Sequence, residues 1–201
     1  MRQRRAYGMV CLLLLVVAFP MANAVDSTVS VDTTWTGDMV LSGNITVASG
    51  ATLTVEPGAT VDARTYSINV EGSMVAERAQ FYSSVVPQTQ GSHGQGLWPG
   101  IVVEAGGLLH LTDSVVANAS AGVLVRGDLV GDGITVNDAY RGVSVVGGSA
   151  NITALEANRI DYEAVYVETG ALNLTNGDAH EVAVGLANHA EAVSYTHLRA
   201  H

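Results

Sequence analysis

The stretch Gly100–Val103 (GIVV) decides the fold, because close copies of it return along the chain. GVLV stands at 122–125, GVSV at 142–145 and AVYV at 164–167, at intervals of 22, 20 and 22 residues. Each copy alternates its side chains in the manner of a short strand. A strand repeat of this length predicts a solenoid, since one repeat cannot bury its apolar face without a stacked neighbour.

A ladder of glycines supports the same period. These glycines open short apolar runs at intervals of 22, 34, 21, 21 and 22 residues, at Gly50, Gly72, Gly106, Gly127, Gly148 and Gly170. The long interval is one repeat plus an insertion. Three short strands per turn, joined by Gly, Asn or Asp corners, suit a parallel β-helix whose coils lie about 4.8 Å apart. The sequence predicts an all-β, right-handed parallel β-helix solenoid of roughly six to seven coils, with 21–22 residues per coil.

The alternation also predicts which side chains line the interior. The inward positions are Ile101, Val103, Val123, Val125, Val143, Val145, Val165 and Val167. A polar row formed by Asn118, Asn137, Asn158 and His180 is interpreted as a structural ladder at one corner, because amides in turns bond the backbone and one another. Trp35 is expected to cover the open end of the first coil.

Residues 1–24 resemble a secretory signal peptide. Three arginines precede an apolar run at 9–19 that is too short to span a bilayer, and 22–24 (Ala-Asn-Ala) offers a cleavage site. An uncleaved anchor is the alternative. The sole cysteine, Cys11, lies inside this segment, so the mature chain has no thiol. We expect a secreted or extracellular cell-surface protein, without membrane insertion after signal cleavage, whose β-helix domain spans 25–192.

The last nine residues, 193–201 (VSYTHLRAH), break the repeat. Their codons, when back-translated, resemble the adapter left by transposase-based sequencing libraries. We interpret this segment as a sequencing-adapter artefact, with a genuine tail as the alternative, and expect the native chain to continue past Ala192. His197 and His201 are therefore excluded from any metal-site argument.

Charge narrows the expected partners. Residues 25–192 carry all 19 acidic residues, five arginines and no lysine, for a formal net charge of −14. Nucleic acid is disfavoured because its binding rests on basic phosphate contacts. Anionic membrane surfaces are disfavoured for the same reason. Carbohydrate and other surface proteins remain as expected partners.

The N-terminal coils resemble a known family. Trp35 followed by Thr-Gly-Asp, GNITV at 43–47, GATLTVEPGATV at 50–61 and WPGI at 98–101 are similar to secreted right-handed parallel β-helix proteins of the pectate-lyase-like superfamily. More narrowly, they resemble microbial cell-surface proteins that carry such repeats. The resemblance covers roughly residues 30–192. It implies the fold, but it leaves function open, because the superfamily includes polysaccharide lyases and hydrolases as well as adhesins without catalysis.

Two places in the sequence are candidates for a catalytic or metal site. The insertion at 87–98 holds His93 and Trp98 but no carboxylate, so we favour a surface loop with Trp98 packed on the coil. Asp113 and Asp132 are expected to stack on adjacent coils, where carboxylate oxygens suit Ca²⁺. No third carboxylate is in register with them. We therefore expect no catalytic residue, cofactor or metal, with Ca²⁺ as the weaker alternative.

Four glycosylation sequons begin at Asn44, Asn118, Asn151 and Asn173. In three of them the middle residue is apolar and is expected to face inward, which turns Asn44, Asn151 and Asn173 toward solvent. Chance occurrence in a chain rich in Asn, Ser and Thr is the alternative.

Val102, Leu124 and Tyr166 lie between the inward pairs and form an outward stripe. This stripe is more apolar than an outer wall requires and can pack on another chain, on a glycan or on the remainder of the protein. The alternative is that these apolar residues only reflect the ordinary preference of strands for such side chains. From all these features we expect a non-catalytic surface module for adhesion, glycan or partner binding, or structural spacing. The alternative is a polysaccharide-active lyase or hydrolase fragment whose catalytic coils lie beyond Ala192.

Overall fold

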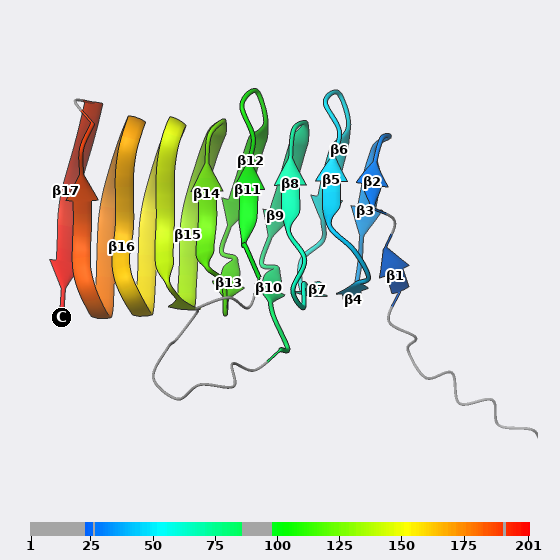
Figure 1. Ribbon diagram of the computed structural model, residues 1–201, viewed down its shortest axis with the longest axis horizontal. Coiled ribbons are helices and arrows are strands. Elements are labelled where there is room, and N and C mark those ends of the chain that lie inside the picture. The colour runs from blue at the N-terminus through cyan, green and yellow to red at the C-terminus, as the bar shows by residue number, and fades with distance from the viewer. Residues whose placement is uncertain (1–22, 26, 86–97, 191) are drawn as a thin grey trace, which may run out of the picture.

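The chain forms a three-sided parallel β-solenoid, seen side-on in the computed structural model (Figure 1). The structure describes residues 23–25, 27–85, 98–190 and 192–201. All 17 strands of these residues belong to one sheet, which winds through about eight turns spaced about 21 residues apart and contains no helix. The predicted all-β parallel solenoid is confirmed, with slightly more turns than the six to seven expected. The expected signal peptide falls almost entirely outside the described residues.

Each side of the solenoid is a stack of strands, one from each turn. Face 1 contains β2 (Thr28–Val29), β5 (Ile45–Val47), β8 (Ile68–Val70), β11 (Ile101–Val103) and β14 (Ala121–Val125). Face 2 contains β3 (Thr33–Trp35), β6 (Thr52–Val55), β9 (Ser73–Glu77) and β12 (Leu108–Thr112). Face 3 contains β1 (Asn23–Val25), β4 (Asp38–Leu41), β7 (Thr60–Asp62), β10 (Gln80–Tyr82) and β13 (Val115–Ala117).

Later strands run on around the corners. β15 (Asp128–Ala139) pairs with both β12 and β13 and so belongs to faces 2 and 3. β16 (Arg141–Asn188) is 48 residues long and winds through more than two turns. β17 (Ala192–Ala200) pairs with β16 in parallel, with Leu172 opposite Val193 and Leu174 opposite Tyr195. Most of β17 is the segment that the sequence led us to interpret as an adapter artefact.

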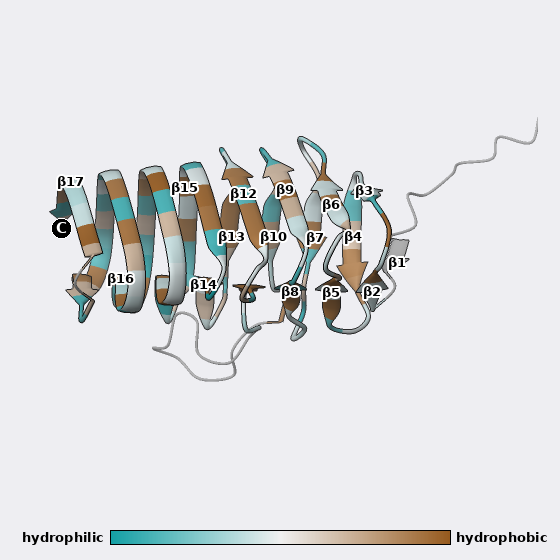
Figure 2. Cartoon of the chain, turned by 90° about the horizontal axis from the view of Figure 1, so that it is seen from above, coloured by the Kyte–Doolittle hydropathy of each residue, from teal (hydrophilic) through white to brown (hydrophobic). Residues whose placement is uncertain are grey.

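The interior is apolar and follows the predicted alternation. All eight predicted inward positions are fully buried: Ile101, Val103, Val123, Val125, Val143, Val145, Val165 and Val167. Ile101 pairs with Val123, and Val123 pairs with Val143, so like side chains stack from turn to turn. Figure 2 shows the resulting alternation of apolar and polar bands along the turns. Trp35 is also buried, on β3 beside Val55.

Glycines allow the turns to approach closely at the corner between faces 1 and 2. A Cβ added to Gly148 would lie 1.9 Å from the carbonyl oxygen of Gly127, and one added to Gly170 would lie 2.2 Å from that of Gly148. The predicted ladder is confirmed at Gly72, Gly127, Gly148 and Gly170, and its reason there is steric. It includes Gly107 rather than Gly106, because Leu108 pairs with Asp128, and Ala51 rather than Gly50, because Thr52 pairs with Ser73.

The other two corners bend mainly through residues in the left-handed backbone region. Between faces 3 and 1 these residues include Arg64, Asn118, Asp138, Arg159 and Glu181, with φ of 53°, 58°, 53°, 53° and 54°. Between faces 2 and 3 they include Asp113, Gly133, Ala154 and Asn176, with φ of 45°, 67°, 61° and 58°. A residue in this region bends the chain sharply from one face to the next. Only Gly, Asn and Asp adopt this region at little energetic cost.

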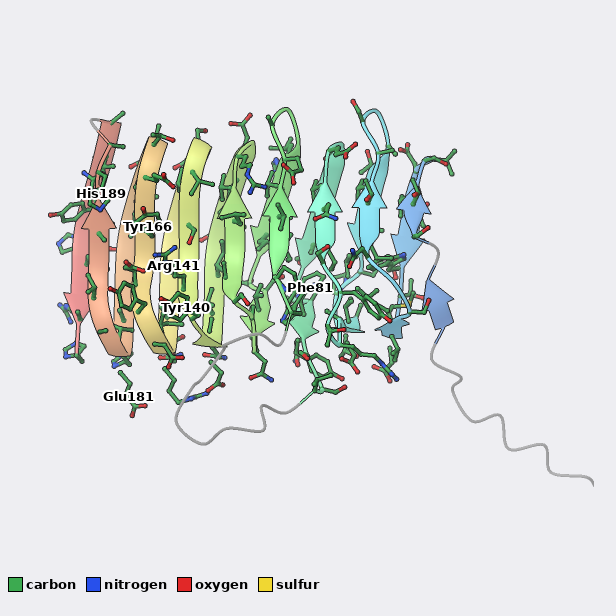
Figure 3. The ribbon with its side chains drawn as sticks, in the orientation of Figure 1. Phe81, Tyr140, Arg141, Tyr166, Glu181 and His189 are labelled. Atoms are coloured by element: carbon green, nitrogen blue, oxygen red, sulfur yellow. The ribbon has the colours of Figure 1, made fainter. Side chains whose placement is uncertain are left out.

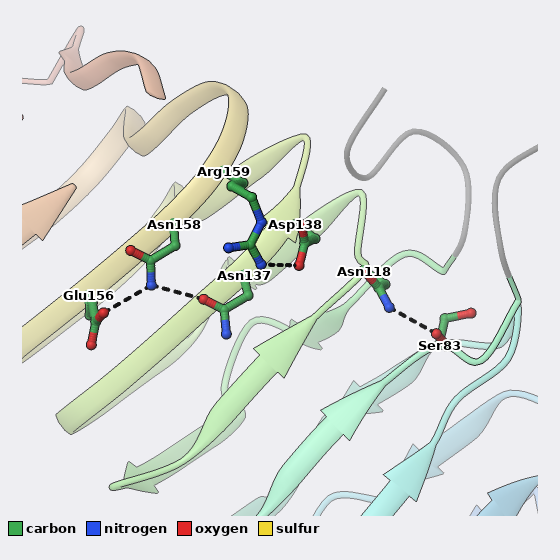
Figure 4. Close-up of polar contacts among 7 residues, drawn as sticks. All are labelled: Ser83, Asn118, Asn137, Asp138, Glu156, Asn158 and Arg159. Atoms are coloured by element: carbon green, nitrogen blue, oxygen red, sulfur yellow. Dashed lines mark hydrogen bonds and ion pairs between the residues drawn. The ribbon is translucent and has the colours of Figure 1, made fainter. Parts of the chain in front are cut away.

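Side chains at the corner between faces 3 and 1 bond from turn to turn (Figure 4). The Asn158 Nδ2 donates to the Asn137 Oδ1 at 3.0 Å, and Arg159 donates two hydrogen bonds of 2.6 Å to the Asp138 carboxylate. Asn118 instead donates to the Ser83 carbonyl at 3.0 Å. The predicted structural role of Asn137 and Asn158 agrees with these contacts, while the register places Ala117, not Asn118, opposite Asn137.

Candidate functional site

The outward stripe on face 1 is the surface from which the site is built. Val102 pairs with Leu124, and Leu124 pairs with Ser144, so the stripe is continuous along the solenoid axis. Val102 and Ser144 are only 7% and 1% exposed, whereas Tyr166 is partly exposed. The Ser144 Oγ makes no hydrogen bond to any described residue. Leu124 is partly exposed as well, so Leu124 and Tyr166 are the accessible members of the stripe.

Tyr166 belongs to an aromatic cluster centred on Arg141. The Arg141 guanidinium carbon lies 4.3 Å from the centre of the Tyr166 ring, 5.7 Å from that of Tyr140 and 5.9 Å from that of Tyr162. A cation within about 6 Å of a ring face is attracted by the ring quadrupole. Figure 3 shows Tyr140, Arg141 and Tyr166 in a row across the outer surface of β16. One cation thus holds three rings that come from two successive turns.

Two of these rings also stack directly on each other. Tyr140 and Tyr162 lie with ring centres 5.6 Å apart and planes inclined by 13°. The solenoid places them there, because the Tyr162 backbone N–H donates to the Tyr140 carbonyl of the preceding turn at 3.0 Å. Tyr166 makes an edge contact with His189, with ring centres 5.9 Å apart. Tyr162 remains 47% exposed.

A carboxylate fixes the guanidinium. Arg141 Nε donates to Glu163 Oε2 at 2.7 Å, and the Glu163 side chain is 6% exposed against 32% for Arg141. Burial alone lowers the pKa of Arg141, but the hydrogen bond and charge of Glu163 outweigh burial, so the pKa is raised above its ordinary value. Arg141 is therefore a permanent cation in a fixed position, with its N–H groups beside three phenol rings.

Of this cluster, strand alternation in the sequence predicts only Tyr166 as a surface residue. The sequence contains a signal for the cluster in two related tripeptides one turn apart, Tyr-Arg-Gly at 140–142 and Tyr-Glu-Ala at 162–164. Each begins with tyrosine, and their second residues carry opposite charges. The stripe was defined only by residues inside the strands. Tyr140 and Tyr162 lie at the corner before face 1, where strand alternation makes no prediction.

The two candidate calcium ligands are offset by one residue. Asp132 pairs with Thr112, and Asp113 lies opposite Gly133, so the carboxylates do not stack in register as expected. The Asp113 N–H donates to the Asp132 carbonyl at 2.8 Å. Across the described residues, no group of three or more His, Cys, Asp or Glu side chains is placed to hold a metal ion.

Asp62 is a buried acid with a structural role. It is 7% exposed, and its Oδ1 accepts hydrogen bonds of 3.0 Å from the backbone N–H groups of Arg64 and Ser84. Its Oδ2 accepts a bond of 2.6 Å from the Ser84 hydroxyl. Burial raises the pKa of Asp62, but the hydrogen bonds from Ser84 and Arg64 outweigh burial and lower it below 3.8. The carboxylate thus ties together two successive turns at the corner after face 3.

The insertion is described only at its end. Trp98 is 1% exposed and donates from Nε1 to the Ala117 carbonyl at 2.9 Å, as expected for a side chain packed on the coil. His93 lies outside the described residues.

The sequon asparagines divide into two groups. Asn151 and Asn173 are exposed and bonded to each other at 3.2 Å on face 2. Asn44 is exposed as well, and its Oδ1 accepts the Ser67 N–H at 3.1 Å. Asn118 is partly buried, so the structure agrees with the expectation that Asn44, Asn151 and Asn173 face solvent.

Comparison of the sequence and structure with known proteins assigns this chain to no family. No family model, curated protein or solved structure matches this chain. In the described part of the chain, no helix is long and apolar enough to cross a membrane.

Proposed function

We propose that this chain is a non-catalytic binding module of a secreted or cell-surface protein. The observation that carries the proposal is the Arg141-centred aromatic cluster on the outer wall of β16. Exposed tyrosines and arginine are the residues that binding surfaces use most, because they combine a large contact area with polar groups. A rigid solenoid wall holds them in place before a ligand arrives, which lowers the entropic cost of binding.

The proposed location outside the cell rests on the signal-like segment 1–24 and on the charge of the domain. A formal net charge of −14 over residues 25–192 suits a soluble surface in a saline exterior, where salt screens the self-repulsion. The exposed asparagines Asn44, Asn151 and Asn173 are the proposed glycan acceptors in a host that glycosylates. A tagged full chain recovered from the culture medium of an expressing host, with its N-terminus at Val25, would support export. Retention of an intact N-terminus inside the cell would contradict it.

The binding function is tested with the purified full chain immobilised on a surface. Neutral and acidic polysaccharides and solubilised cell-surface proteins are passed over it in turn. We expect retention of at least one of these probes, and loss of that retention when the cluster is altered. An absence of retention for every probe would argue against a binding module and in favour of a structural spacer.

The alternative of a polysaccharide-active lyase or hydrolase rests on the resemblance to the pectate-lyase-like superfamily. It predicts release of unsaturated or reducing sugars from acidic polysaccharides, with a response to Ca²⁺ in the lyase case. Turnover by this chain would contradict the non-catalytic proposal. The same samples serve both assays, so binding without turnover separates the two functions.

A further inference from the structure

We propose that Tyr162, together with the neighbouring Arg141–Glu163 pair, binds a neutral sugar ring of a glycan. This inference rests on the proposed binding function and names the ligand of the same site. All residues of the proposed site precede Ala192 and so lie outside the segment interpreted as an adapter artefact.

Tyr162 supplies an aromatic surface that is exposed and already fixed. Its ring is 47% exposed, yet it stacks on Tyr140 and lies 5.9 Å from the guanidinium carbon of Arg141. An aromatic ring held in this way loses little rotamer freedom when a ligand docks on it. A pyranose ring presents a flat patch of C–H groups, and this patch complements the face of a phenol ring.

Polar groups that suit sugar hydroxyls lie beside this ring. Arg141 uses Nε for its bond to Glu163, and the guanidinium carries further N–H donors on its two terminal nitrogens. The tyrosine hydroxyls both donate and accept hydrogen bonds. An apolar surface with a few fixed polar groups around it is the usual composition of a small-ligand site.

The charges favour a neutral sugar over an acidic one. The Arg141 cation is paired with the Glu163 carboxylate at 2.7 Å, so the pair has little net charge to offer a uronate. The domain around it carries a formal net charge of −14, which repels acidic polymers at long range. A neutral sugar ring needs no unpaired cation for its binding, and the net negative charge of the domain does not repel it.

The surroundings favour a sugar over a protein partner. A stable protein interface buries about 800 Å² on each side around a largely apolar centre. Near Tyr162 the corner instead carries the exposed charges of Arg159 and Glu181, and the exposed apolar residue one turn onward is Val184. One aromatic platform within a polar corner matches the size of a sugar ring.

The test is affinity electrophoresis of the full chain in native gels that contain hydroxyethylcellulose, mannan or polygalacturonate. We expect retardation by at least one of the two neutral polymers and none by polygalacturonate. Tyr162→Ala should weaken that retardation at least about tenfold, whereas Tyr162→Phe keeps the ring and should stay within about twofold of the unaltered chain. Val130→Ala, which removes an apolar side chain 41% exposed on face 2, is the matched control and should change nothing.

Circular dichroism and urea unfolding of each variant exclude a folding defect as the cause. The inference is overturned if neither neutral polymer retards the chain, if polygalacturonate alone does so, or if Tyr162→Ala binds like the unaltered chain. Retention of a cell-surface protein that depends on Tyr162 would also overturn it, in favour of a protein partner. Retention that does not depend on Tyr162 would leave the binding function standing and reject only this site.

Discussion

Replacing Gly148 with alanine tests the steric reason for the glycine ladder. The added methyl carbon would lie 1.9 Å from the Gly127 carbonyl oxygen and 2.7 Å from the Arg126 carbonyl carbon. Both are backbone atoms, so no side-chain rotation relieves the overlap. The two turns must separate by about 1 Å or more to restore van der Waals contact. That movement stretches the hydrogen bond of 2.9 Å from the Ser149 N–H to the Gly127 carbonyl.

The expected loss of unfolding free energy is the sum of two terms. Forcing an extra carbon into a close-packed contact costs about 1–3 kcal/mol. A weakened backbone hydrogen bond adds about 1 kcal/mol. The total of about 2–4 kcal/mol corresponds to a fall in melting temperature of roughly 5–15 °C for a domain of this size.

The assay is urea and thermal unfolding followed by circular dichroism, with Gly43→Ala as the matched control. Gly43 has no atom within 4 Å of its ideal Cβ position, and its φ lies outside the left-handed region. Gly43→Ala should therefore leave stability unchanged or raise it by a few tenths of a kcal/mol. If Gly148→Ala unfolds at the same urea concentration as Gly43→Ala, the close approach of the turns does not explain the ladder.

Three further predictions concern buried and strained groups. Because the folded-state pKa of Asp62 is below 3.8, its carboxylate stabilises the fold fully above that pH, and the contribution disappears as the pH falls through the folded-state pKa. Urea unfolding from about pH 7 to about pH 2 should therefore show the unaltered chain losing its advantage over Asp62→Asn at the acid end, and a constant difference would contradict this. Glu163→Gln should cost about 1–3 kcal/mol because it leaves the partly buried Arg141 without its counter-charge; a double-mutant cycle with Arg141→Met should show coupling, and additive losses would refute the pair. Ala154→Gly should raise stability by about 0.5–1 kcal/mol, since alanine is strained at a φ of 61°, and a lower melting temperature would count against the corner strain.

Strand alternation made the wall of the solenoid predictable. Val123 and Val125 alternate with Leu124, and a side chain on a strand has only two directions in which to point. Most of the glycine ladder was predictable for a similar reason, because a corner where one turn approaches the next closely leaves little room for a Cβ. The predicted register was one residue off at Gly106 and Gly50, where Gly107 and Ala51 occupy the ladder.

The corners and the aromatic cluster could not be predicted in the same way. The intervals of 22, 20 and 22 residues change the length of each corner, so residues there have no constant offset from the strands. Asp113 lies opposite Gly133 for a simpler reason, since the two turns pair with an offset of 20 residues on both sides of that corner, whereas Asp113 and Asp132 are 19 residues apart. The varying corner length hid the stacking of Tyr140 on Tyr162, which depends on corner geometry. Left-handed φ values at Ala154 and Arg159 contradict local preference, and the hydrogen-bonded sheet imposes them.

The register across the insertion shows how this architecture accommodates evolutionary change. Ile68 pairs with Ile101 although 33 residues separate them, while Ile101 pairs with Val123 after 22 residues. The turns on either side stay aligned, so extra length at the corner between faces 3 and 1 does not propagate into the wall. Tyr140 and Tyr162 approach face 1 at that same corner. Insertions and deletions there can therefore diversify what the surface recognises, while the stacked interior stays unchanged.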